Sequence, residues 1–455
     1  MNILYLHTHD TGKVISPYGY DVKTPNYQEL CDDSLLFNNS FSVAPTCSPS
    51  RAGLLTGCYP HQNGMLGLAQ RGFKIDEDKH LAQFLNKNGY HTVLCGVQHE
   101  SHYYLDHDLA YEELGYVEDI TTSCKEYEEA DLIYWDQKNA DSLCNWLSNR
   151  NKEKSFFVSF GMHATHRKFP KEIDDEFGVD ECIPVSTVKE NKISKEEFAR
   201  FKTTLKVADN IVGKIIKQLK DLKLYDETII ILTTDHGIPF PFHKCSLTDN
   251  GIGVLFAMHV PNAKKDIKTY DGLISHIDVF PTICDLLNLE KPEHLVGNSF
   301  ACLFEGENKI IRNEIYAGIN FHTSYEPTRC IRTERYKYIR NFDESYDKLN
   351  YSNIDNSPYK TFLTENGLLE VKKPFEALYD LYFDPTENKN VINEPMYESV
   401  LKELKEKLKT QMENTNDPLL NGNISIKPEW KVNKKDCYSP GSKDKNDYES
   451  WGIKR

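Results

Sequence analysis

Residues 194–237 read SKEEFARFKTTLKVADNIVGKIIKQLKDLKLYDETIIILTTDHG. Apolar residues recur at helical spacing from Phe198 to Leu219, which predicts an amphipathic helix over residues 194–222. The apolar run at residues 228–233 predicts a short buried strand. Further strand-like runs occupy residues 2–6, 91–95, 155–160 and 254–259. This alternation predicts an α/β fold with a doubly wound, largely parallel sheet.

The pattern changes after about Asn308. Four further strands are predicted at residues 314–320, 328–333, 336–341 and 377–382, followed by a helix at residues 396–412. We therefore predict a smaller C-terminal α+β domain with an antiparallel sheet, and divide the chain into residues 1–325 and 326–455. The charged, turn-rich residues 434–446 are expected to form a loose tail.

Composition excludes several classes of protein. The 455 residues include 54 Lys plus Arg against 69 Asp plus Glu, a net charge of -15, which argues against a nucleic-acid-binding surface. No apolar run is long enough to span a membrane, and the N-terminus lacks the pattern of a signal peptide, so we expect a cytoplasmic protein without a membrane partner. The 12 cysteines have no regular spacing and are expected to be mostly reduced thiols.

Residues that bind metals or move protons follow four of the predicted strands. In doubly wound sheets, ligands bind at the carboxyl ends of the strands. Any one of these histidines could be an ordinary surface or core residue, but their concentration at four strand ends indicates a functional site. The residues are His7, His9 and Asp10; His99 and Glu100; His163, His166 and Arg167; and Asp235 and His236.

The segment CSPSRAGLLTG, residues 47–57, is the most specific in the chain. Pro49 suits the first position of a helix and Gly57 suits its end, which places Cys47 just before the helix N-terminus. An oxyanion there would meet free N–H groups, and Arg51 adds a permanent positive charge. The residues therefore indicate an anion site beside a nucleophile candidate, although a buried structural Cys remains equally compatible with the spacing.

The same segment resembles the signature of the type I, formylglycine-dependent sulfatases of the alkaline phosphatase superfamily. The likeness continues at Asp10, at residues 234–237 (TDHG), at residues 278–282 (DVFPT) and at residues 377–381 (ALYDL). Two short strings, HQNGM at residues 61–65 and GIPFP at residues 237–241, look most like the heparan N-sulfatase branch, the N-sulfoglucosamine sulfohydrolases. The resemblance implies an alkaline-phosphatase-like fold and hydrolysis of a sulfate ester or sulfamate on a sulfated sugar such as N-sulfoglucosamine.

The resemblance also implies a role for each matching residue. A maturation enzyme would convert Cys47 to formylglycine, whose hydrated gem-diol attacks sulfur while Arg51 holds the diol and sulfate. His99 would deprotonate the second hydroxyl to release sulfate, and His166 and Lys244 would bind sulfate and protonate the leaving atom. One divalent metal, calcium by resemblance, would be held by Asp10, Asp235, His236 and the group derived from Cys47, with His9 as a weaker member.

Substrate contacts are predicted from two parts of the chain. Arg167 would flank His166, and His322 and Arg329 could reach the cleft from the second domain. A basic surface hairpin is an equally good interpretation of the last two.

Three positions depart from the family pattern. His9 stands where an acidic ligand is usual, His236 stands where Asn is usual, and Val97 replaces a sulfate-binding Lys. Nitrogen ligands shift metal preference from calcium toward manganese, iron or zinc. Two alternative functions stay open: a phosphonate monoester or phosphodiester hydrolase of the same superfamily, and a non-catalytic carbohydrate-binding relative. The oligomeric state is not predicted.

Overall fold

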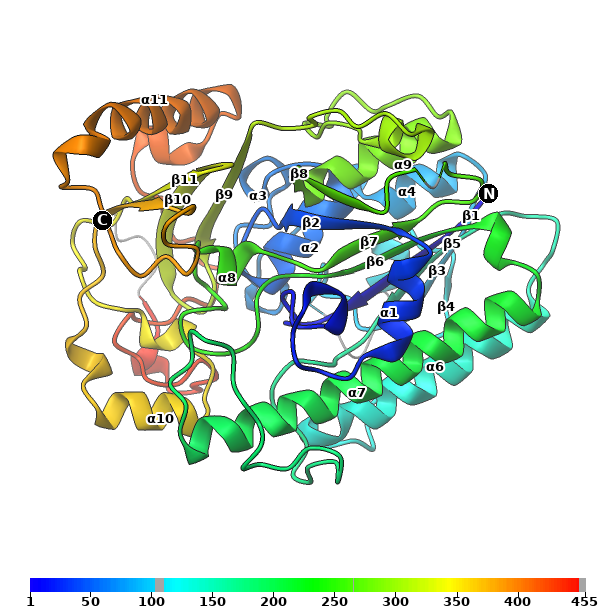
Figure 1. Ribbon diagram of the computed structural model, residues 1–455, viewed down its shortest axis with the longest axis horizontal. Helices are drawn as coiled ribbons and strands as arrows, with labels where there is room; N and C mark the ends of the chain where they lie inside the picture. Colours follow the sequence, from blue (N-terminus) through cyan, green and yellow to red (C-terminus); the bar gives the residue numbers. More distant parts are fainter. Residues whose placement is uncertain (103–109, 265, 450–455) are drawn as a thin grey trace.

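The computed structural model describes residues 1–102, 110–264 and 266–449. Its larger sheet has the strand order β4-β3-β5-β1-β6-β7-β2-β8 (Figure 1). All neighbouring strands run parallel except β7, which is antiparallel to both β6 and β2. The strands are β1 (Asn2–Thr8), β2 (Leu35–Phe41), β3 (His91–Gly96), β4 (Glu118–Asp119), β5 (Phe156–Gly161), β6 (Thr228–Thr234), β7 (Phe256–His259) and β8 (Thr269–Ser275). The predicted doubly wound, largely parallel sheet is confirmed.

Helices cover both faces of this sheet. One face carries α1 (Pro25–Asp32), α6 (Leu132–Asn149) and α7 (Lys192–Asp221), and the other carries α2 (Cys47–Thr56), α4 (Leu81–Lys87) and α9 (Val279–Leu287). Shorter helices are α3 (Pro60–Asn63), α5 (Ala110–Glu113) and α8 (Asp249–Ile252).

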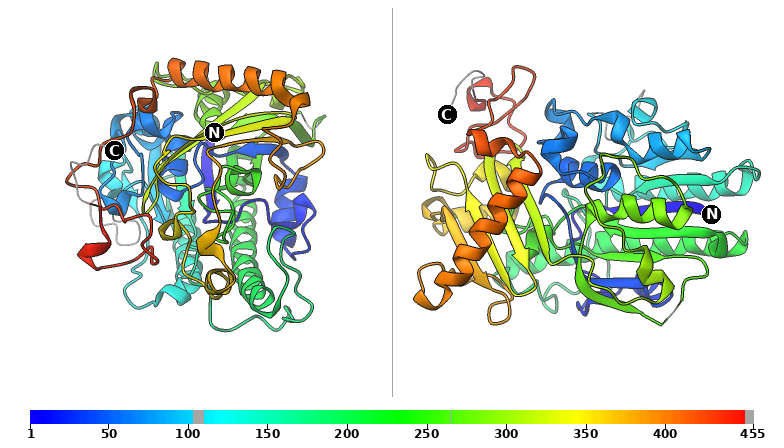
Figure 2. Two further views of the ribbon diagram at one scale, coloured as in Figure 1. Left: turned by 90° about the vertical axis from the view of Figure 1, so that its left-hand side faces the viewer. Right: turned by 90° about the horizontal axis from the view of Figure 1, so that it is seen from above.

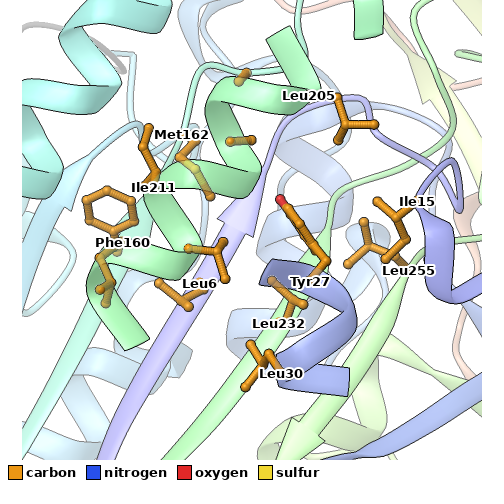
Figure 3. Close-up of a cluster of buried hydrophobic side chains, with 14 of the residues drawn as sticks. Leu6, Ile15, Tyr27, Leu30, Phe160, Met162, Leu205, Ile211, Leu232 and Leu255 are labelled. Carbon is orange, nitrogen blue, oxygen red and sulfur yellow. The ribbon is translucent and has the colours of Figure 1, made fainter. Parts of the chain in front are cut away.

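Strand β1 shows how the sequence builds two cores. Leu4 and Leu6 point into the core under α1, α6 and α7, whereas Ile3 and Tyr5 point into the core under α2, α4 and α9. This follows from the alternation of side chains along a strand. Figure 3 shows the first core, where Leu6 lies among side chains of β5, β6, α1 and α7.

Three strands of the sheet, β2, β4 and β8, are absent from the sequence prediction. Strand β4 consists of only two acidic residues, and β2 and β8 carry polar residues in mid-strand, with Asn38 and Asn39 in β2 and Asp271 in β8. Their apolar runs are therefore too short to be recognised without the neighbouring strands.

The second sheet is antiparallel, as predicted, with the order β12-β11-β10-β9. Its strands are β9 (Glu314–Phe321), β10 (Tyr325–Thr333), β11 (Tyr336–Asn341) and β12 (Glu376–Asp380), accompanied by α10 (Pro358–Glu365) and α11 (Glu398–Asn414). Helix α11 covers one face, and the other face packs against the first domain (Figure 2).

The predicted division between residues 325 and 326 falls inside β10, directly after its first residue, and leaves most of β10 in a different domain from its partner β9. Strand β9 forms seven registered pairs with β10, including Ala317 with Cys330. Because both strands belong to the second sheet, we propose that the division be drawn before Glu314.

The expectation of a loose tail at residues 434–446 is wrong. Lys435 and Cys437 are buried, and two cations of the body of the protein bind carbonyls of this segment: Lys360 Nζ lies 2.6 Å from the Tyr438 carbonyl, and the Arg71 guanidinium donates to Pro440. Charge and turn composition predicted a loose segment, and many of its side chains are indeed exposed, but carbonyls bound by buried cations fix its backbone in place.

Candidate active site

The carboxyl ends of β1, β3, β5 and β6 meet at one edge of the larger sheet, and helix α2 begins there. Cys47 is the first residue of α2, so the helix starts two residues earlier than the position of Pro49 predicts. Gly57 ends it in the left-handed region, with φ of 63°, as expected from its lack of a Cβ. Cys47 is 1% exposed, and burial raises the pKa of its thiol well above the usual range. An unmodified, neutral thiol here is a weak nucleophile.

Four side chains converge on one point beside Cys47. The Cys47 Sγ lies 3.3 Å from His236 Nε2 and 3.9 Å from Asp10 Oδ1. His236 Nε2 lies 3.1 Å from Asp10 Oδ1 and 3.9 Å from Asp235 Oδ2. All four residues are buried. Two buried carboxylates this close to each other require a positive charge between or beside them, so the donor set fits a divalent cation.

The orientation of His236 also suits a metal ligand. Its Nδ1 lies 3.0 Å from the carbonyl oxygen of Gly237, which only accepts hydrogen bonds. Nδ1 therefore donates to this carbonyl, and Nε2 faces Asp10 and Cys47. A ring nitrogen bonded to a carbonyl in this way is the usual support of a metal-binding His.

His9 joins the two carboxylates rather than replacing one of them. Its Nδ1 lies 2.8 Å from Asp10 Oδ1 and 3.2 Å from Asp235 Oδ2. Burial lowers the pKa of His9 to about 4, although Asp235 and Asp10 oppose the shift. A neutral imidazole at this position can donate a lone pair or a proton, and the site is richer in nitrogen than a site of oxygen ligands alone.

Arg51 holds Asp235, one of the four residues of the candidate metal site, in position. Its Nε and one terminal nitrogen lie 3.2 and 3.0 Å from Asp235 Oδ2, and its other terminal nitrogen contacts His7 Nδ1. A further bond of 3.0 Å reaches the carbonyl of Thr8. Most of the guanidinium donors are therefore used to position Asp235, and the charge of Arg51 acts on the site at close range.

Lys244 and His166 lie on the other side of Asp10. Lys244 Nζ is 2.8 Å from Asp10 Oδ2 and 3.2 Å from His166 Nε2. Burial alone would lower the pKa of Lys244, but Asp10 and Asp355 raise it well above the usual value. Lys244 is therefore a permanent cation, which suits binding an anion better than donating a proton.

His99 lies near His9 and is held by Gln70. Its Nε2 is 2.8 Å from Gln70 Oε1, and its ring centre is 5.5 Å from that of His9. Burial, with His9 and Arg51, lowers the pKa of His99 well below the usual value. A neutral His is the form that accepts a proton.

The remaining predicted residues divide into those near the site and those away from it. His322 is buried directly after β9, and burial together with the charge of Lys244 lowers its pKa well below the usual value. We therefore keep it as a proposed residue of the site. Arg167 lies beside His166, but its guanidinium is bound to Glu197 and to the Pro239 carbonyl. We therefore propose Arg167 as a residue that positions the wall of the cleft.

The structure does not bring Arg329 into the cluster. Its guanidinium binds Asp417 at 2.7 and 3.1 Å, Asn320 at 2.7 Å, and the carbonyls of Ile319 and Thr328. With its donors bound inside the second domain, Arg329 has a structural role, and we withdraw it as a substrate contact.

Val97 also turns away from the site. Its side chain is buried against Leu132 and Trp135 of α6. An apolar side chain in this cluster cannot replace the sulfate-binding Lys that the family pattern places there. His163, which the sequence places at a strand end without a specific role, also lies in the histidine cluster, with its ring centre 5.2 Å from that of His166.

Three residues were missed from the sequence. Asp355 contacts Lys244, Gln70 contacts His99, and Glu197 holds Arg167. None follows a strand of the larger sheet and none lies in a recognisable motif, so no local signal marked them.

The sulfatase family model matches residues 2–289. This chain belongs to the sulfatase family. A second family model, N-sulphoglucosamine sulphohydrolase, C-terminal, matches residues 235–365. Family members hydrolyse sulfate esters and sulfamates, so the chain is a sulfatase, and the predicted closeness to the N-sulfoglucosamine sulfohydrolase branch is confirmed.

Curated relatives agree with this assignment. An ulvan-active sulfatase of Formosa agariphila is 30% identical over 90% of this chain and 79% of its own length. The N-sulphoglucosamine sulphohydrolase of Homo sapiens is 25% identical over 92% of this chain and 91% of its own.

Solved structures show the same fold. The structure of BT4656 with its substrate D-glucosamine-2-N,6-O-disulfate matches with a TM-score of 0.70 and 18% identity, over 91% of this chain and 98% of that one. The phosphonate monoester hydrolase of Agrobacterium radiobacter matches with a TM-score of 0.71 and 20% identity, over 94% of this chain and 100% of that one. The predicted alkaline-phosphatase-like architecture is therefore confirmed. No described helix is both long and apolar enough to cross a membrane.

Proposed function

We propose that this sulfatase removes a sulfate group from a sulfated sugar, with N-sulfoglucosamine as the leading substrate. The observation that carries the proposal is the convergence of Cys47, Asp10, Asp235 and His236 within one buried cluster, with Lys244 beside it. The match to the N-sulphoglucosamine sulphohydrolase C-terminal model supports the sugar and the N-sulfate.

Formylglycine, made from Cys47 by a maturation enzyme, would supply a hydrated aldehyde whose oxygen attacks sulfur and later releases sulfate as the aldehyde returns. The position of Cys47 at the start of α2, among buried charged groups, fits this use. Arg51 acts mainly through Asp235, which it holds in place, and its charge favours the anionic reacting group.

A divalent cation held by Asp10, Asp235, His236 and the group derived from Cys47 would supply a positive charge that stabilises the sulfate oxygens. Because His236 offers a nitrogen and His9 lies within reach of both carboxylates, we propose manganese or zinc in preference to calcium.

Two histidines would transfer protons, and Lys244 would hold the sulfate group. Neutral His99, held by Gln70, would take the proton whose removal frees sulfate. Lys244 would bind a sulfate oxygen, and His166, whose Nε2 lies 3.2 Å from Lys244 Nζ, would protonate the leaving atom. For a sulfamate the balance is one water consumed, one S–N bond broken, and an ammonium and a sulfate formed.

Conversion of Cys47 gives the first prediction. Peptide mass spectrometry of active enzyme should show the aldehyde at Cys47, and Cys47→Ala should lose nearly all turnover while its melting curve stays close to wild type. Cys58→Ala, at a buried thiol outside the site, is the matched control. Full activity in Cys47→Ala would overturn the proposed nucleophile.

The similarity to a phosphonate monoester hydrolase supports one alternative function, hydrolysis of a phosphonate monoester or phosphodiester. Wild-type enzyme carrying the aldehyde should be assayed on N-sulfoglucosamine, on 2-O-, 3-O- and 6-O-sulfated glucosamines, and on an aryl phosphodiester. Preference for the phosphodiester would replace the proposed substrate class with the alternative one.

A further inference from the structure

A carboxylate of the second domain reaches into the active site. Asp355 follows the short 3₁₀ helix at Tyr351–Asn353 and precedes α10. Its Oδ2 lies 3.1 Å from Lys244 Nζ, so Lys244 lies between Asp355 and Asp10. The Asp355 side chain is 17% exposed, and its pKa is lowered to about 2, because Lys244 and His166 outweigh the effect of burial. Asp355 is therefore ionised and lies at the solvent edge of a buried site.

The segment that carries Asp355 is held firmly. The fully buried Lys360 donates to the carbonyls of Tyr351 at 2.9 Å, Ile354 at 2.7 Å and Tyr438 at 2.6 Å. Asn353 Oδ1 accepts hydrogen bonds from the backbone N–H groups that follow His322. The backbone on both sides of Asp355 is thus pinned, and the position of the carboxylate is a feature of the fold.

Asp355 is unfavourable for a site that binds only an anion. A sulfate group is negatively charged, and a carboxylate next to its cation repels it. Lys244 does not need Asp355 for charge balance, since Asp10 already lies 2.8 Å away. A carboxylate here becomes favourable when the substrate brings hydrogen-bond donors or a positive charge to the same place.

We propose that Asp355 recognises the nitrogen of an N-sulfated amino sugar and stabilises the amine that leaves. This inference rests on the proposed function and names its substrate class more closely. When the S–N bond breaks, the electron pair stays on nitrogen, which gains protons and leaves as an ammonium, while the water consumed supplies the fourth sulfate oxygen. Asp355 accepts a hydrogen bond from this nitrogen before cleavage and forms an ion pair with it afterwards. An O-sulfate releases a neutral hydroxyl and gains less from the carboxylate.

His322 completes this side of the site. Its ring is buried, and its Nδ1 has no hydrogen-bond partner in the described part of the chain. Burial, with Lys244, lowers the pKa of His322 well below the usual value, so the ring is neutral. A neutral imidazole beside a carboxylate suits a neighbouring sugar hydroxyl, which can both donate and accept.

The test is Asp355→Asn, which keeps the size of the side chain and removes its charge. We expect the ratio of kcat/KM for N-sulfoglucosamine to that for 4-nitrophenyl sulfate to fall by roughly tenfold or more. Glucosamine, the cationic product, should inhibit the wild type more strongly than N-acetylglucosamine does. This difference between the two competitive inhibitors should shrink in Asp355→Asn. Asp347→Asn is the matched control, because Asp347 lies on the same segment and pairs with the exposed Lys372.

The outcomes separate this inference from the proposed function. Equal losses on both substrates, or an unchanged ratio, overturn the role of Asp355 and assign it to positioning Lys244. A wild-type enzyme that cleaves O-sulfated sugars but leaves N-sulfoglucosamine intact also overturns it, although the sulfatase activity stands. If no sulfate substrate is cleaved, the proposed function fails, and binding of glucosamine to wild type and Asp355→Asn, measured by calorimetry, still decides the inference. Asp355→Glu, which keeps the charge, should retain more of the glucosamine preference than Asp355→Asn.

Discussion

The imidazoles of His236 and His9 supply the nitrogen ligands of the candidate metal site. His236 directs Nε2 toward Asp10 and Cys47 because its Nδ1 is bonded to the Gly237 carbonyl. His9 places Nδ1 against both Asp10 and Asp235. Nitrogen donors favour manganese, iron or zinc, whereas calcium prefers a shell of oxygens. We therefore propose that His236 and His9 set the preference of the candidate site for one cation over another.

His236→Asn should move metal preference toward calcium. Replacing the ring nitrogen by an amide oxygen should weaken zinc or manganese binding by roughly tenfold or more, with a smaller effect on calcium. Metal content after dialysis against equal concentrations of the ions, measured by elemental mass spectrometry, checks this. His91→Asn, at a partly exposed imidazole paired with Glu118, serves as the control. Unchanged selectivity would show that His236 does not set the metal.

Helix α4 illustrates how one element depends on a neutral His. His80 Nδ1 accepts a hydrogen bond of 3.1 Å from Ala82 N at the start of the helix. His80 is completely buried, and burial lowers its pKa to about 3. The cap therefore requires the unprotonated ring, as an N-cap acceptor must carry a free lone pair.

This cap gives a pH prediction. In the unfolded chain His80 takes up a proton near pH 6.5, whereas the folded protein resists it down to about pH 3. The contribution of His80 to the free energy of unfolding is therefore complete above pH 6.5. Below pH 6.5 it falls by about 1.4 kcal/mol per pH unit. Between pH 7 and pH 5 the loss should be about 2 kcal/mol.

His80→Asn keeps a cap acceptor and removes the titration. In urea unfolding, the difference in free energy between pH 7 and pH 5 should be about 2 kcal/mol smaller in the variant than in wild type. His91→Asn is again the control, since that ring is partly exposed. If the free energy of unfolding changed equally between pH 7 and pH 5 in His80→Asn and wild type, the assignment of His80 as a neutral helix cap would be wrong.

At the scale of the whole molecule, the two domains form one packed body. The inner face of the second sheet buries Ile315, Ala317 and Ile319 against Phe41 and other residues of the first domain. The active site depends on this packing, because residues of both domains surround Lys244.

A buried ion cluster fixes the same interface. Lys337 of β11 is fully buried, and its Nζ lies 2.5 Å from Asp249 Oδ1 and 2.8 Å from Glu387 Oε1. Arg332 adds a contact of 3.1 Å to Asp249. Removing one member of such a cluster leaves the other charges buried without compensation.

Lys337→Met should therefore destabilise the protein by about 3–5 kcal/mol. Chemical unfolding followed by fluorescence measures the change. Lys405→Met, at a more exposed Lys paired with Glu376, should cost no more than about 1 kcal/mol. Similar small losses in both variants would show that the cluster does not hold the domains together.

Periodicity and local motifs were sufficient to predict the fold class and the edge of the sheet where the candidate site lies, but not strands β2, β4 and β8. Alternating apolar runs predict the sheet, and the residues that follow β1, β3, β5 and β6 do meet at one edge. Helix α2 also forms where its own residues predict a helix, although it starts at Cys47, two residues before the position that Pro49 indicates. Local sequence predicts these features because each strand or helix is specified by residues adjacent in the chain. The carboxyl ends of parallel strands then share one edge of the sheet.

Side-chain direction and contacts between distant segments were decided only by the tertiary structure. Arg329 pairs with Asp417, 88 positions away, and so does not reach the site. Val97 packs under α6 instead of facing the site. Asp355 reaches Lys244 because Lys360 and the packing of the two domains hold its segment there. Buried charges take whichever partner the fold brings close, and that choice is not encoded in spacing along the chain.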